Sequence, residues 1–432
     1  MNGKMSEIRI PCGKSFMTAE IPDDELAGIF RPQLPDPAPD PAAEVRRAMA
    51  APFDAPRLEE LARGKKSAVI IISDHTRPVP SRFILPPMLE ALRRGSPGIG
   101  IKLLVATGFH RLTTPEELRN KLGDGIFEKE EIVVHDSGDP GALRKIGLLP
   151  SGGELIVNRT ALETDLLLAE GFIEPHFFAG FSGGRKSVLP GIAARETVLA
   201  NHCAEFIAHP CARTGSLEGN PIHKDMLFAA EAVKLAFIVN VVIDQQKRIV
   251  RAFAGAPRAA HAAGCAFLGD LARISVPESD IVITGNGGYP LDQNLYQSVK
   301  GMTAGEAAVR QGGVIIICAA CADGSGGESF RRTLAEDPSP QAVLERIAGV
   351  PRNRTIPDQW ESQILARVLS KAAVIVVSRE IDPDLPRSMH MHHASSLPAA
   401  LQTARTLLSG RPPRIAVIPD GVSVIVNQTK GN

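Results

Sequence analysis

The sequence predicts an α/β protein of two domains, each with a mostly parallel sheet, and an active site in the cleft between the domains. Short apolar runs typical of buried strands alternate with longer helical stretches along most of the chain, and this spacing favours parallel strands covered by helices on both faces. The chain has 432 residues, more than one ordinary hydrophobic core accommodates. Active sites in such proteins favour loops at the carboxyl ends of strands and clefts between domains.

The first predicted domain covers residues 1–275. A proline-rich connector at residues 32–43 is incompatible with a helix or a central strand. Thr114, Pro115 and Glu117 predict the start of a helix, because they supply a cap, a first-turn proline and the partner of a capping box. The expected strands are residues 67–73, 101–107, 131–135, 154–158, 165–171 and 235–244, followed by an alanine- and leucine-rich helix at 256–272.

The second predicted domain, residues 276–432, is a Rossmann-like α/β unit. Residues 275–280 (SVPESD) indicate a linker at its start. Long helical stretches, including the one around Trp360, separate the apolar runs. The expected strands are residues 281–285, 313–319, 372–378 and 414–420. Periodicity leaves open whether the last segment, residues 414–426, belongs to this sheet or returns to the N-terminal domain.

Charge and composition exclude several classes of protein. Lys and Arg together number 48, as do Asp and Glu, so the formal net charge is zero, whereas a nucleic-acid-binding protein usually has a basic excess. No apolar run approaches the roughly 18 residues that span a membrane, and the first residues lack the apolar stretch of a secretory signal. The six cysteines are too sparse for a disulfide framework. We therefore expect a cytoplasmic protein that binds neither nucleic acid nor a membrane.

The most informative segment is GFIEPHFFAGFSGGRKSVLPGIAARETVLANH, near the middle of the chain. Gly183 and Gly184 would let the backbone approach a bound anion closely. Lys186, beside them, is suited to pair with phosphate or to form a covalent bond. His176 and His202 are each suited to bind a metal or to carry a proton. The segment therefore has the parts of a cofactor-bearing active site.

Six segments extend the pattern along the chain. They are SDHTRPVP (73–80), ATGFHR (106–111), EPHFFAGFSGGRKSVLPGI (174–192), NH (201–202), GNGGYPLDQNLYQSVKGM (285–302) and DQWESQILARVL (358–369). Taken in this order, they strongly resemble the nickel-pincer lactate racemase family. Several of the segments are long and unusual, so the resemblance is specific for the family and much less so for the substrate.

The resemblance implies a cofactor that the N-terminal domain would bear. This is the nickel-pincer nucleotide, pyridinium-3,5-bisthiocarboxylic acid mononucleotide, whose two sulfur-containing arms hold nickel. Lys186 would be attached covalently to it, and His202 would complete the nickel coordination. His110 and His176 would be the two acid/base residues. Enzymes that assemble the cofactor are implied as partners.

The resemblance also implies two further groups of site residues. Those near the substrate are Arg77, Tyr296, Gln297, Lys300 and Trp360. Those that would bind the phosphate and ribose of the cofactor are Asp74, Thr76, Gly183 and Gly184.

The implied reaction is the racemisation or epimerisation of a lactate-like 2-hydroxy acid, which would make the protein an isomerase. The C–H bond of such an acid is barely acidic, and hydride transfer to an electron-poor pyridinium ring avoids a carbanion. Two histidines, one on each face of the substrate, would each be the base for one enantiomer and the acid for the other. The alternatives are a dehydrogenase or hydro-lyase on the same scaffold, or a protein that only carries the cofactor.

Other patterns in the sequence have simpler interpretations. GFSGGRKS resembles a P-loop, but Arg185 replaces the glycine that precedes the lysine, which argues against nucleotide hydrolysis. Cys318 and Cys321 form a CxxC pattern at the end of a buried strand, and we expect a structural role for them. The histidine-rich residues 389–396 are expected to form a loop. Phe109 either lines the substrate pocket or packs into the core.

Overall fold

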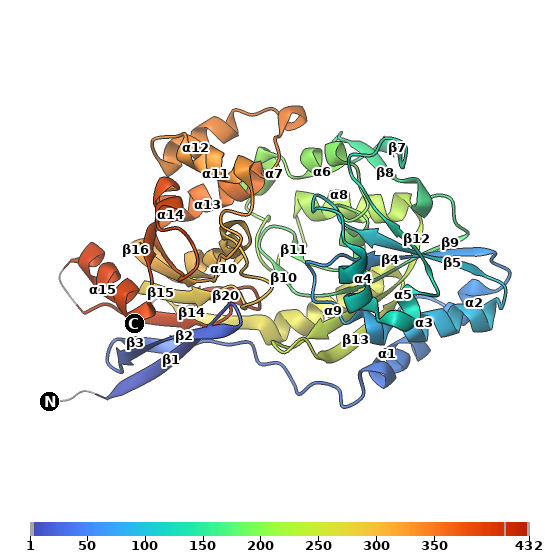
Figure 1. Ribbon diagram of the computed structural model, residues 1–432, viewed down its shortest axis with the longest axis horizontal. Helices are drawn as coiled ribbons and strands as arrows, with labels where there is room; N and C mark the ends of the chain where they lie inside the picture. The colour runs from blue at the N-terminus through green and yellow to red at the C-terminus, as the bar shows by residue number, and fades with distance from the viewer. Residues whose placement is uncertain (1–3, 410–411, 430–432) are drawn as a thin grey trace.

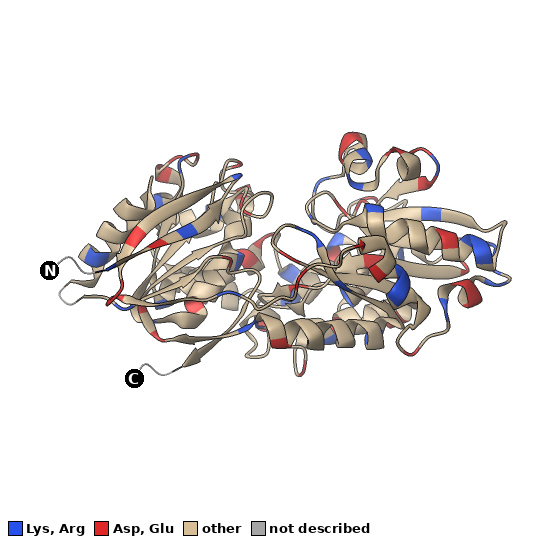
Figure 2. Cartoon of the chain, turned by 90° about the horizontal axis from the view of Figure 1, so that it is seen from below, with Lys and Arg blue, Asp and Glu red and all other residues tan. Residues whose placement is uncertain are grey.

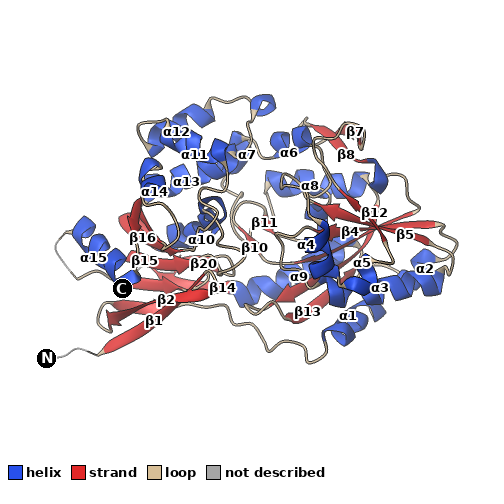
Figure 3. Ribbon diagram, in the orientation of Figure 1, coloured by secondary structure: helices blue, strands red, loops and turns tan. Residues whose placement is uncertain are grey.

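The computed structural model describes residues 4–409 and 412–429, and it contains two α/β units, each built on a six-stranded sheet (Figure 1). Helices surround both sheets, as the colouring by secondary structure shows (Figure 3). The predicted fold class, two α/β units with mostly parallel sheets, is confirmed.

The first sheet contains most of the strands expected in the first domain. Its neighbours are parallel except for one antiparallel pair at the edge, β12 with β13. The strand order is β13 (Ile249–Gly255), β12 (Leu235–Ile243), β9 (Leu166–Phe172), β4 (Ser67–Ser73), β5 (Gly100–Ala106) and β6 (Glu131–Val134). The apolar run at 154–158 instead forms a separate hairpin, β7 (Leu143–Leu148) with β8 (Glu154–Asn158).

Helices cover both faces of this sheet, so its central strands are buried on both sides. Ile70 and Ile72 of β4 pack in one hydrophobic cluster, and Val69 and Ile71 pack in another on the opposite face. The helices are α1 (Pro41–Ala50), α2 (Leu58–Ala62), α3 (Ser81–Gly95), α4 (Pro115–Leu122), α5 (Asp124–Phe127), α6 (Arg195–Asn201), α7 (Ala204–Ala208), α8 (Pro221–Ala232) and α9 (Pro257–Ala272). The predicted cap of α4 is confirmed, because Thr114 and Glu117 form a capping box with Pro115 in the first turn.

The second sheet is parallel throughout. Its order is β18 (His392–Ala394), β17 (Ala373–Val377), β16 (Val309–Cys318), β15 (Ser279–Gly285), β19 (Ile415–Ile418) and β3 (Leu26–Ile29). Its helices are α10 (Leu295–Ala308), α11 (Glu328–Ala335), α12 (Pro340–Ala348), α13 (Gln359–Lys371), α14 (Asp384–Ser388) and α15 (Leu397–Leu408).

The start of the chain lies against the second sheet. The hairpin of β1 (Met5–Cys12) and β2 (Ser15–Pro22) packs its apolar face on this sheet, and β3 pairs with β19. In Figure 1 these blue strands lie beside the red end of the chain. A domain boundary near residue 275 stays a prediction, but residues 5–29 pair and pack with the second unit. This pairing joins strands almost 400 positions apart, so no local pattern announces it.

Two segments differ from the sequence-based expectation, and a third, which the sequence left open, is placed by the structure. The linker expected at 275–280 is wrong, because β14 (Arg273–Pro277) and β15 follow one another there. β14 pairs with β20 (Ile425–Thr429), and β19 lies in the second sheet, so neither late strand joins the first sheet. Within residues 389–396, His392–Ala394 forms an edge strand.

The two units contact each other through α7 and α13. Gln363 on α13 donates a hydrogen bond from Nε2 to the carbonyl of Ala204 at 2.9 Å, and Arg352 forms an ion pair with Glu205 at 2.7 Å. Basic and acidic residues are interspersed over both units (Figure 2). Among the described residues, no helix has both the length and the apolar character that crossing a membrane requires.

Candidate functional site

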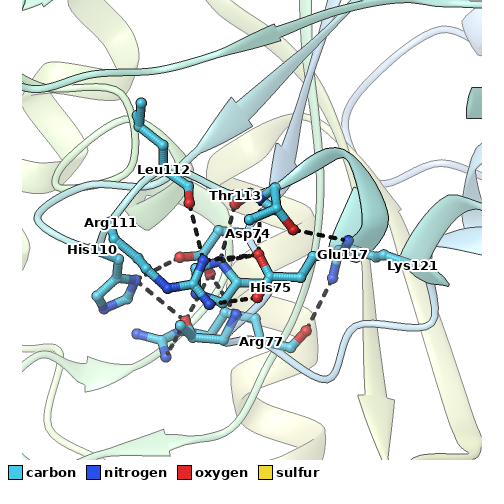
Figure 4. Close-up of polar contacts among 11 residues, drawn as sticks. Asp74, His75, Arg77, His110, Arg111, Leu112, Thr113, Glu117 and Lys121 are labelled. Carbon is cyan, nitrogen blue, oxygen red and sulfur yellow. Dashed lines mark hydrogen bonds and ion pairs between the residues drawn. The ribbon is translucent and has the colours of Figure 1, made fainter. Parts of the chain in front are cut away.

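Four expected site residues lie together in the loops that follow β4 and β5. Because these neighbouring strands are parallel, their carboxyl ends meet at the same edge of the sheet. The Nδ1–H of His110 donates to Oδ2 of Asp74 at 2.6 Å, and the hydroxyl of Thr76 donates to Oδ1 at 2.7 Å. Arg77 donates from Nη1 to the Thr76 hydroxyl at 3.1 Å. Figure 4 shows His110 and Asp74 side by side in this group.

The charge of Asp74 fixes the tautomer of His110. Burial favours the neutral acid, but His110, Arg77 and the Thr76 hydroxyl outweigh it and hold the pKa of the Asp74 carboxyl well below its usual value. The carboxylate therefore accepts the Nδ1 proton, which leaves the lone pair of Nε2 free. This arrangement prepares His110 to act as a base through Nε2.

Buried charged residues brace the loop that carries Asp74 and Arg77. Lys121 of α4 donates from Nζ to the carbonyl of Arg77 at 3.0 Å, as Figure 4 shows. Glu170 of β9 accepts from the backbone N–H of Ser73 at 3.0 Å, immediately before Asp74. These contacts hold the loop in place. Glu170 is almost fully buried, with only 1% of the residue exposed.

His176 and Lys186 form a second group. His176 ends β10 (Pro175–His176), which pairs with β11 (Gly180–Phe181), and Lys186 lies in a short 3-10 helix, Gly184–Ser187. Nε2 of His176 lies 3.3 Å from Nζ of Lys186, and Nδ1 accepts the backbone N–H of Ala179 at 3.3 Å. Since Nδ1 accepts, the proton of a neutral His176 ring lies on Nε2.

Both side chains of this group favour their neutral forms. Burial, followed by the charges of Lys186 and Lys300, holds the pKa of His176 well below its ordinary value. Burial, followed by the charges of Arg185 and Arg77, does the same to the pKa of Lys186. A neutral His176 thus has its proton on Nε2, whereas His110 has a lone pair there.

The two glycines of this segment are packed against protein. Gly183 and Gly184 have φ angles of +79° and +54°, which favour glycine. A Cβ on Gly184 would approach the ring of His261 to 2.8 Å, and its N–H already donates to Oδ1 of Asn240 at 2.7 Å. The conformation of the turn accounts for both glycines, and their contact with a cofactor phosphate stays a prediction.

His202 lies in a cage of aromatic rings. It caps the carboxyl end of α6, and its ring centroid is 5.1 Å from that of Phe178 and 5.0 Å from that of Trp360. Trp360 donates from its indole N–H to the hydroxyl of Tyr296 at 2.9 Å, and it also contacts the ring of Phe109. Phe109 therefore belongs to the same aromatic wall.

The imidazole of His202 is buried and has an unused donor atom. Its Nδ1 is enclosed and has no hydrogen-bond partner. Burial, with a contribution from the charge of Lys186, lowers the pKa of His202 to about 3, so the ring is neutral. A neutral ring with an unpaired nitrogen is the form that binds a metal.

Gln297 and Lys300 contribute from α10 of the second unit. Nζ of Lys300 donates to Oε1 of Gln297 at 2.7 Å. Burial lowers the pKa of Lys300 to about 8, and the charge of Arg77 acts in the same direction. The charges of Glu174 and Glu361 raise the pKa of Lys300. Burial raises the pKa of both carboxyls.

A pocket of about 420 Å³ lies between His176 and Lys300. Residues of the first unit, including Glu174 and His176, line one side of it, and residues of the second unit, including Asn286, Lys300 and Thr303, line the other. It therefore opens where the two units meet.

The structure brings the expected residues into one region, in which the two glycines adjoin Lys186 and pack against protein. Charges of Arg77 and Lys300 act on His176, which links the groups to one another. Sequence reasoning missed Glu174, Lys121 and Glu361. Glu174 and Glu361 lie within the recognised segments, but the burial of their carboxyls near Lys300 is visible only after folding.

This combination of fold and side chains is that of a two-domain α/β enzyme whose candidate site contains histidines beside a buried amine. Two family models match the chain: the lactate racemase N-terminal domain over residues 12–215, and the lactate racemase C-terminal domain over residues 274–426. The chain belongs to the lactate racemase family, and it is an isomerase of the racemase class.

Two curated relatives match almost the whole chain. The lactate racemase of Thermoanaerobacterium thermosaccharolyticum is 53% identical over 98% of this chain and 100% of its own length. The lactate racemase of Lactiplantibacillus plantarum is 51% identical with the same coverage. The solved structure of the T. thermosaccharolyticum lactate racemase apoprotein superimposes with a TM-score of 0.94, covering 98% of this chain and 100% of that one.

A more distant structure shares only the fold. It is a Thermotoga maritima protein that is 19% identical, with a TM-score of 0.67 over 92% of this chain and 100% of that chain.

Proposed function

We propose that the protein racemises lactate or a closely similar 2-hydroxy acid, with His110 and His176 as the acid/base pair. The observation that supports this most directly is the 2.6 Å hydrogen bond from Nδ1 of His110 to the Asp74 carboxylate, which leaves a lone pair on Nε2 and lets the ring accept a proton. Racemisation needs a base for the hydroxyl proton of one enantiomer and an acid for the return of a proton on the other face. The identity to two curated lactate racemases supports lactate as the substrate.

We further infer that the chain holds the nickel-pincer nucleotide implied by its family. Among the described residues, no group of three or more His, Cys, Asp or Glu side chains is placed to hold a metal ion. A metal at His202 would then need donors that arrive with a ligand, and the sulfur arms of the nucleotide are such donors. The unpaired Nδ1 of His202 fits metal coordination, and the amine of Lys186, whose pKa burial lowers, fits covalent attachment. When bound, the nucleotide would supply a reversible acceptor for hydride.

The remaining residues would bind and orient the substrate. Arg77 and Lys300 would hold its carboxylate, since a guanidinium and an ammonium are the two cations that face His176 from the loop after β4 and from α10. Gln297 would keep Lys300 in place through its 2.7 Å hydrogen bond. His110 would accept the hydroxyl proton at Nε2, while Asp74 stabilises the imidazolium that forms. The wall of Phe109, Tyr296 and Trp360 would exclude water.

The pocket between the units supports an active site in an interdomain cleft. We propose that residues 1–275 and 276–432 are the two domains that close over the substrate, apart from the N-terminal strands that pack on the second sheet. Asp74 and Thr76 would serve the ribose or phosphate of the nucleotide in addition to positioning His110. We place the protein in the cytoplasm, where the cofactor-assembly enzymes would load it.

An isotope experiment tests the proposed reaction. Enantiopure lactate with deuterium at C2 should lose its optical purity when mixed with loaded enzyme in ordinary water, while the deuterium stays on carbon. Hydride chemistry retains the label, whereas abstraction of a proton exchanges it with solvent. Chiral chromatography with mass detection measures both quantities in one sample. Free loss of the label during racemisation would contradict hydride transfer.

The same assay separates the alternatives. A dehydrogenase would accumulate a 2-oxo acid, and a hydro-lyase would accumulate an alkene. A carrier protein would bind the nucleotide and leave the enantiomer unchanged. Equal amounts of both enantiomers, with neither of the other products, are expected of a racemase.

The pKa of Lys300 gives a prediction for pH. Because burial lowers this pKa to about 8, the ammonium is charged below pH 8 and becomes neutral above it. If Lys300 holds the substrate carboxylate, KM for lactate should be constant below about pH 7 and rise about tenfold per pH unit well above pH 8. Lys300→Arg should remove this rise, because a guanidinium stays charged throughout the range. A KM that does not change up to about pH 10 would contradict the role of Lys300.

A further inference from the structure

Arg185 is a buried cation with a dense set of hydrogen bonds. Only 2% of the residue is exposed. Its Nη1 donates to the carbonyl of Phe181 at 2.8 Å, and its Nη2 donates to the carbonyl of Ala179 at 2.7 Å. Nη1 also lies 3.2 Å from the carbonyl of Gly183. One guanidinium therefore binds three carbonyls of the turn that connects His176 to Lys186.

Neutral imidazoles surround the rest of this guanidinium. Nε of Arg185 donates to Nδ1 of His223 at 2.9 Å, and burial lowers the pKa of His223 to about 4. Nη1 of Arg185 lies 2.9 Å from Nε2 of His261, and the same Nε2 lies 2.9 Å from the carbonyl of Ser182. Burial, followed by the charge of Arg185, holds the pKa of His261 well below its ordinary value.

No carboxylate takes part in these contacts. Across residues 4–409 and 412–429, Arg185 forms no ion pair and its hydrogen-bond partners are carbonyls and imidazoles. A buried charge without a counter-charge is unfavourable, and proteins usually pair such groups. A guanidinium that only fastened a turn could be replaced by a neutral donor at a lower energetic cost.

We propose that Arg185 is a positioning residue whose guanidinium fixes the turn between His176 and Lys186 and carries a positive charge at the position that precedes Lys186 in the chain. The three carbonyl contacts hold the backbone on both sides of the hairpin, and so set the 3.3 Å separation of His176 and Lys186. The charge of Arg185 disfavours protonation of the neighbouring amine, because two adjacent cations in a buried site repel each other. An uncharged amine has the lone pair that nucleophilic attack requires.

Other groups around Lys186 do not reverse this effect. Burial is the largest cause of the lowered pKa of Lys186, and the charges of Arg185, Arg77 and Lys300 lower it further. The charge of Glu174 raises it. The facing ring of His176 is neutral and contributes no charge. Arg185 is the nearest of the cations along the chain, and its side chain is anchored by the turn itself. The charged and titratable groups that face the amine are Arg185, Arg77, Lys300, Glu174 and His176.

This inference rests on the proposed attachment of the cofactor at Lys186, but its test does not use the cofactor. The full chain, made without the cofactor-assembly enzymes, is treated with a trace of acetic anhydride from about pH 6 to about pH 11. The free amine attacks a carbonyl of the anhydride, which forms an amide and releases acetate and a proton. Peptide mass spectrometry gives the fraction of Lys186 labelled at each pH, and exposed Lys224 is the internal reference.

Labelling of Lys186 should reach half of its maximum at a lower pH than that of Lys224. Arg185→Gln should move the Lys186 midpoint up by about one pH unit. It should also speed backbone hydrogen exchange over residues 179–186 about tenfold, because the carbonyl contacts are lost. Arg185→Lys keeps a positive charge but loses the planar guanidinium that contacts several carbonyls at once. It should therefore speed hydrogen exchange over residues 179–186 while leaving the labelling midpoint of Lys186 low.

Arg213→Gln is the matched control. Arg213 is a partly buried arginine that donates to two carbonyls, those of His209 and Ala212, and both lie outside the turn between His176 and Lys186. Arg213→Gln should change neither the labelling midpoint of Lys186 nor the hydrogen-exchange rates over residues 179–186. The proposal is wrong if Arg185→Gln folds and leaves the midpoint and the exchange rates unaltered. It is equally wrong if, in the unaltered chain, Lys186 and Lys224 share one midpoint. Successful labelling without any later cofactor adduct would count against the attachment at Lys186 and not against Arg185.

Discussion

His110→Ala and His176→Ala should each lower kcat for racemisation by about 100-fold to 10,000-fold, the range that a positioned general acid or base contributes. Both substitutions impair both directions of the reaction, because each enantiomer needs one ring as base and the other as acid. Nickel should stay bound in both variants, since neither ring is the proposed metal ligand. Chiral chromatography measures the rate, and elemental analysis of the purified protein measures the metal.

Asp74→Asn refines this experiment. The amide no longer stabilises a protonated His110, so the variant should lose activity mainly when His110 acts as the base. In single-turnover reactions, the enantiomer that presents its hydroxyl to His110 should slow more than its mirror image. His392→Ala, at an exposed position of the edge strand β18, is the control and should racemise normally. A normal rate in either His110→Ala or His176→Ala would overturn the scheme of two histidines.

Much of the fold was predictable because its strands are local apolar runs. The runs at 67–73 and 372–378 became β4 and β17 almost residue for residue. The elements that escaped prediction depend on distant partners. β3 pairs with β19, almost 400 positions away in the chain, and β14 pairs with β20 across about 150 positions. A short strand of this kind has no periodicity of its own to distinguish it from a linker.

The sequence named the residues of the candidate site, but it did not give the contacts between them. The recognised segments contained His110, His176 and Lys186, and the structure brings them together. No sequence pattern gives the protonation states, because these follow from the 2.6 Å contact with Asp74 and the 3.3 Å contact with the Ala179 N–H. Arg185 illustrates the same limit. In the sequence, Arg185 is notable only because it interrupts a P-loop pattern. In the structure, its guanidinium binds the turn that connects His176 to Lys186.

Lys186→Met should abolish turnover and leave the protein without a covalent adduct. Methionine has a similar length and no amine, so it preserves packing while removing the only group of this side chain able to form the bond. Thermal stability should be equal to or higher than that of the unaltered chain, because the substitution removes an amine that burial and neighbouring cations disfavour. Intact-protein mass spectrometry, after production alongside the cofactor-assembly enzymes, detects the adduct, and peptide mapping locates it.

The control separates loss of attachment from loss of structure. Lys224→Met changes an exposed lysine of α8, and the variant should keep both the adduct and the activity. If Lys186→Met is as stable as expected but inactive, the defect is chemical and lies at the missing amine. Attachment at Lys186 is contradicted by fully active enzyme whose intact mass matches the bare chain. It is contradicted as well by an adduct that persists after Lys186 has been replaced, because the bond would then lie on another residue.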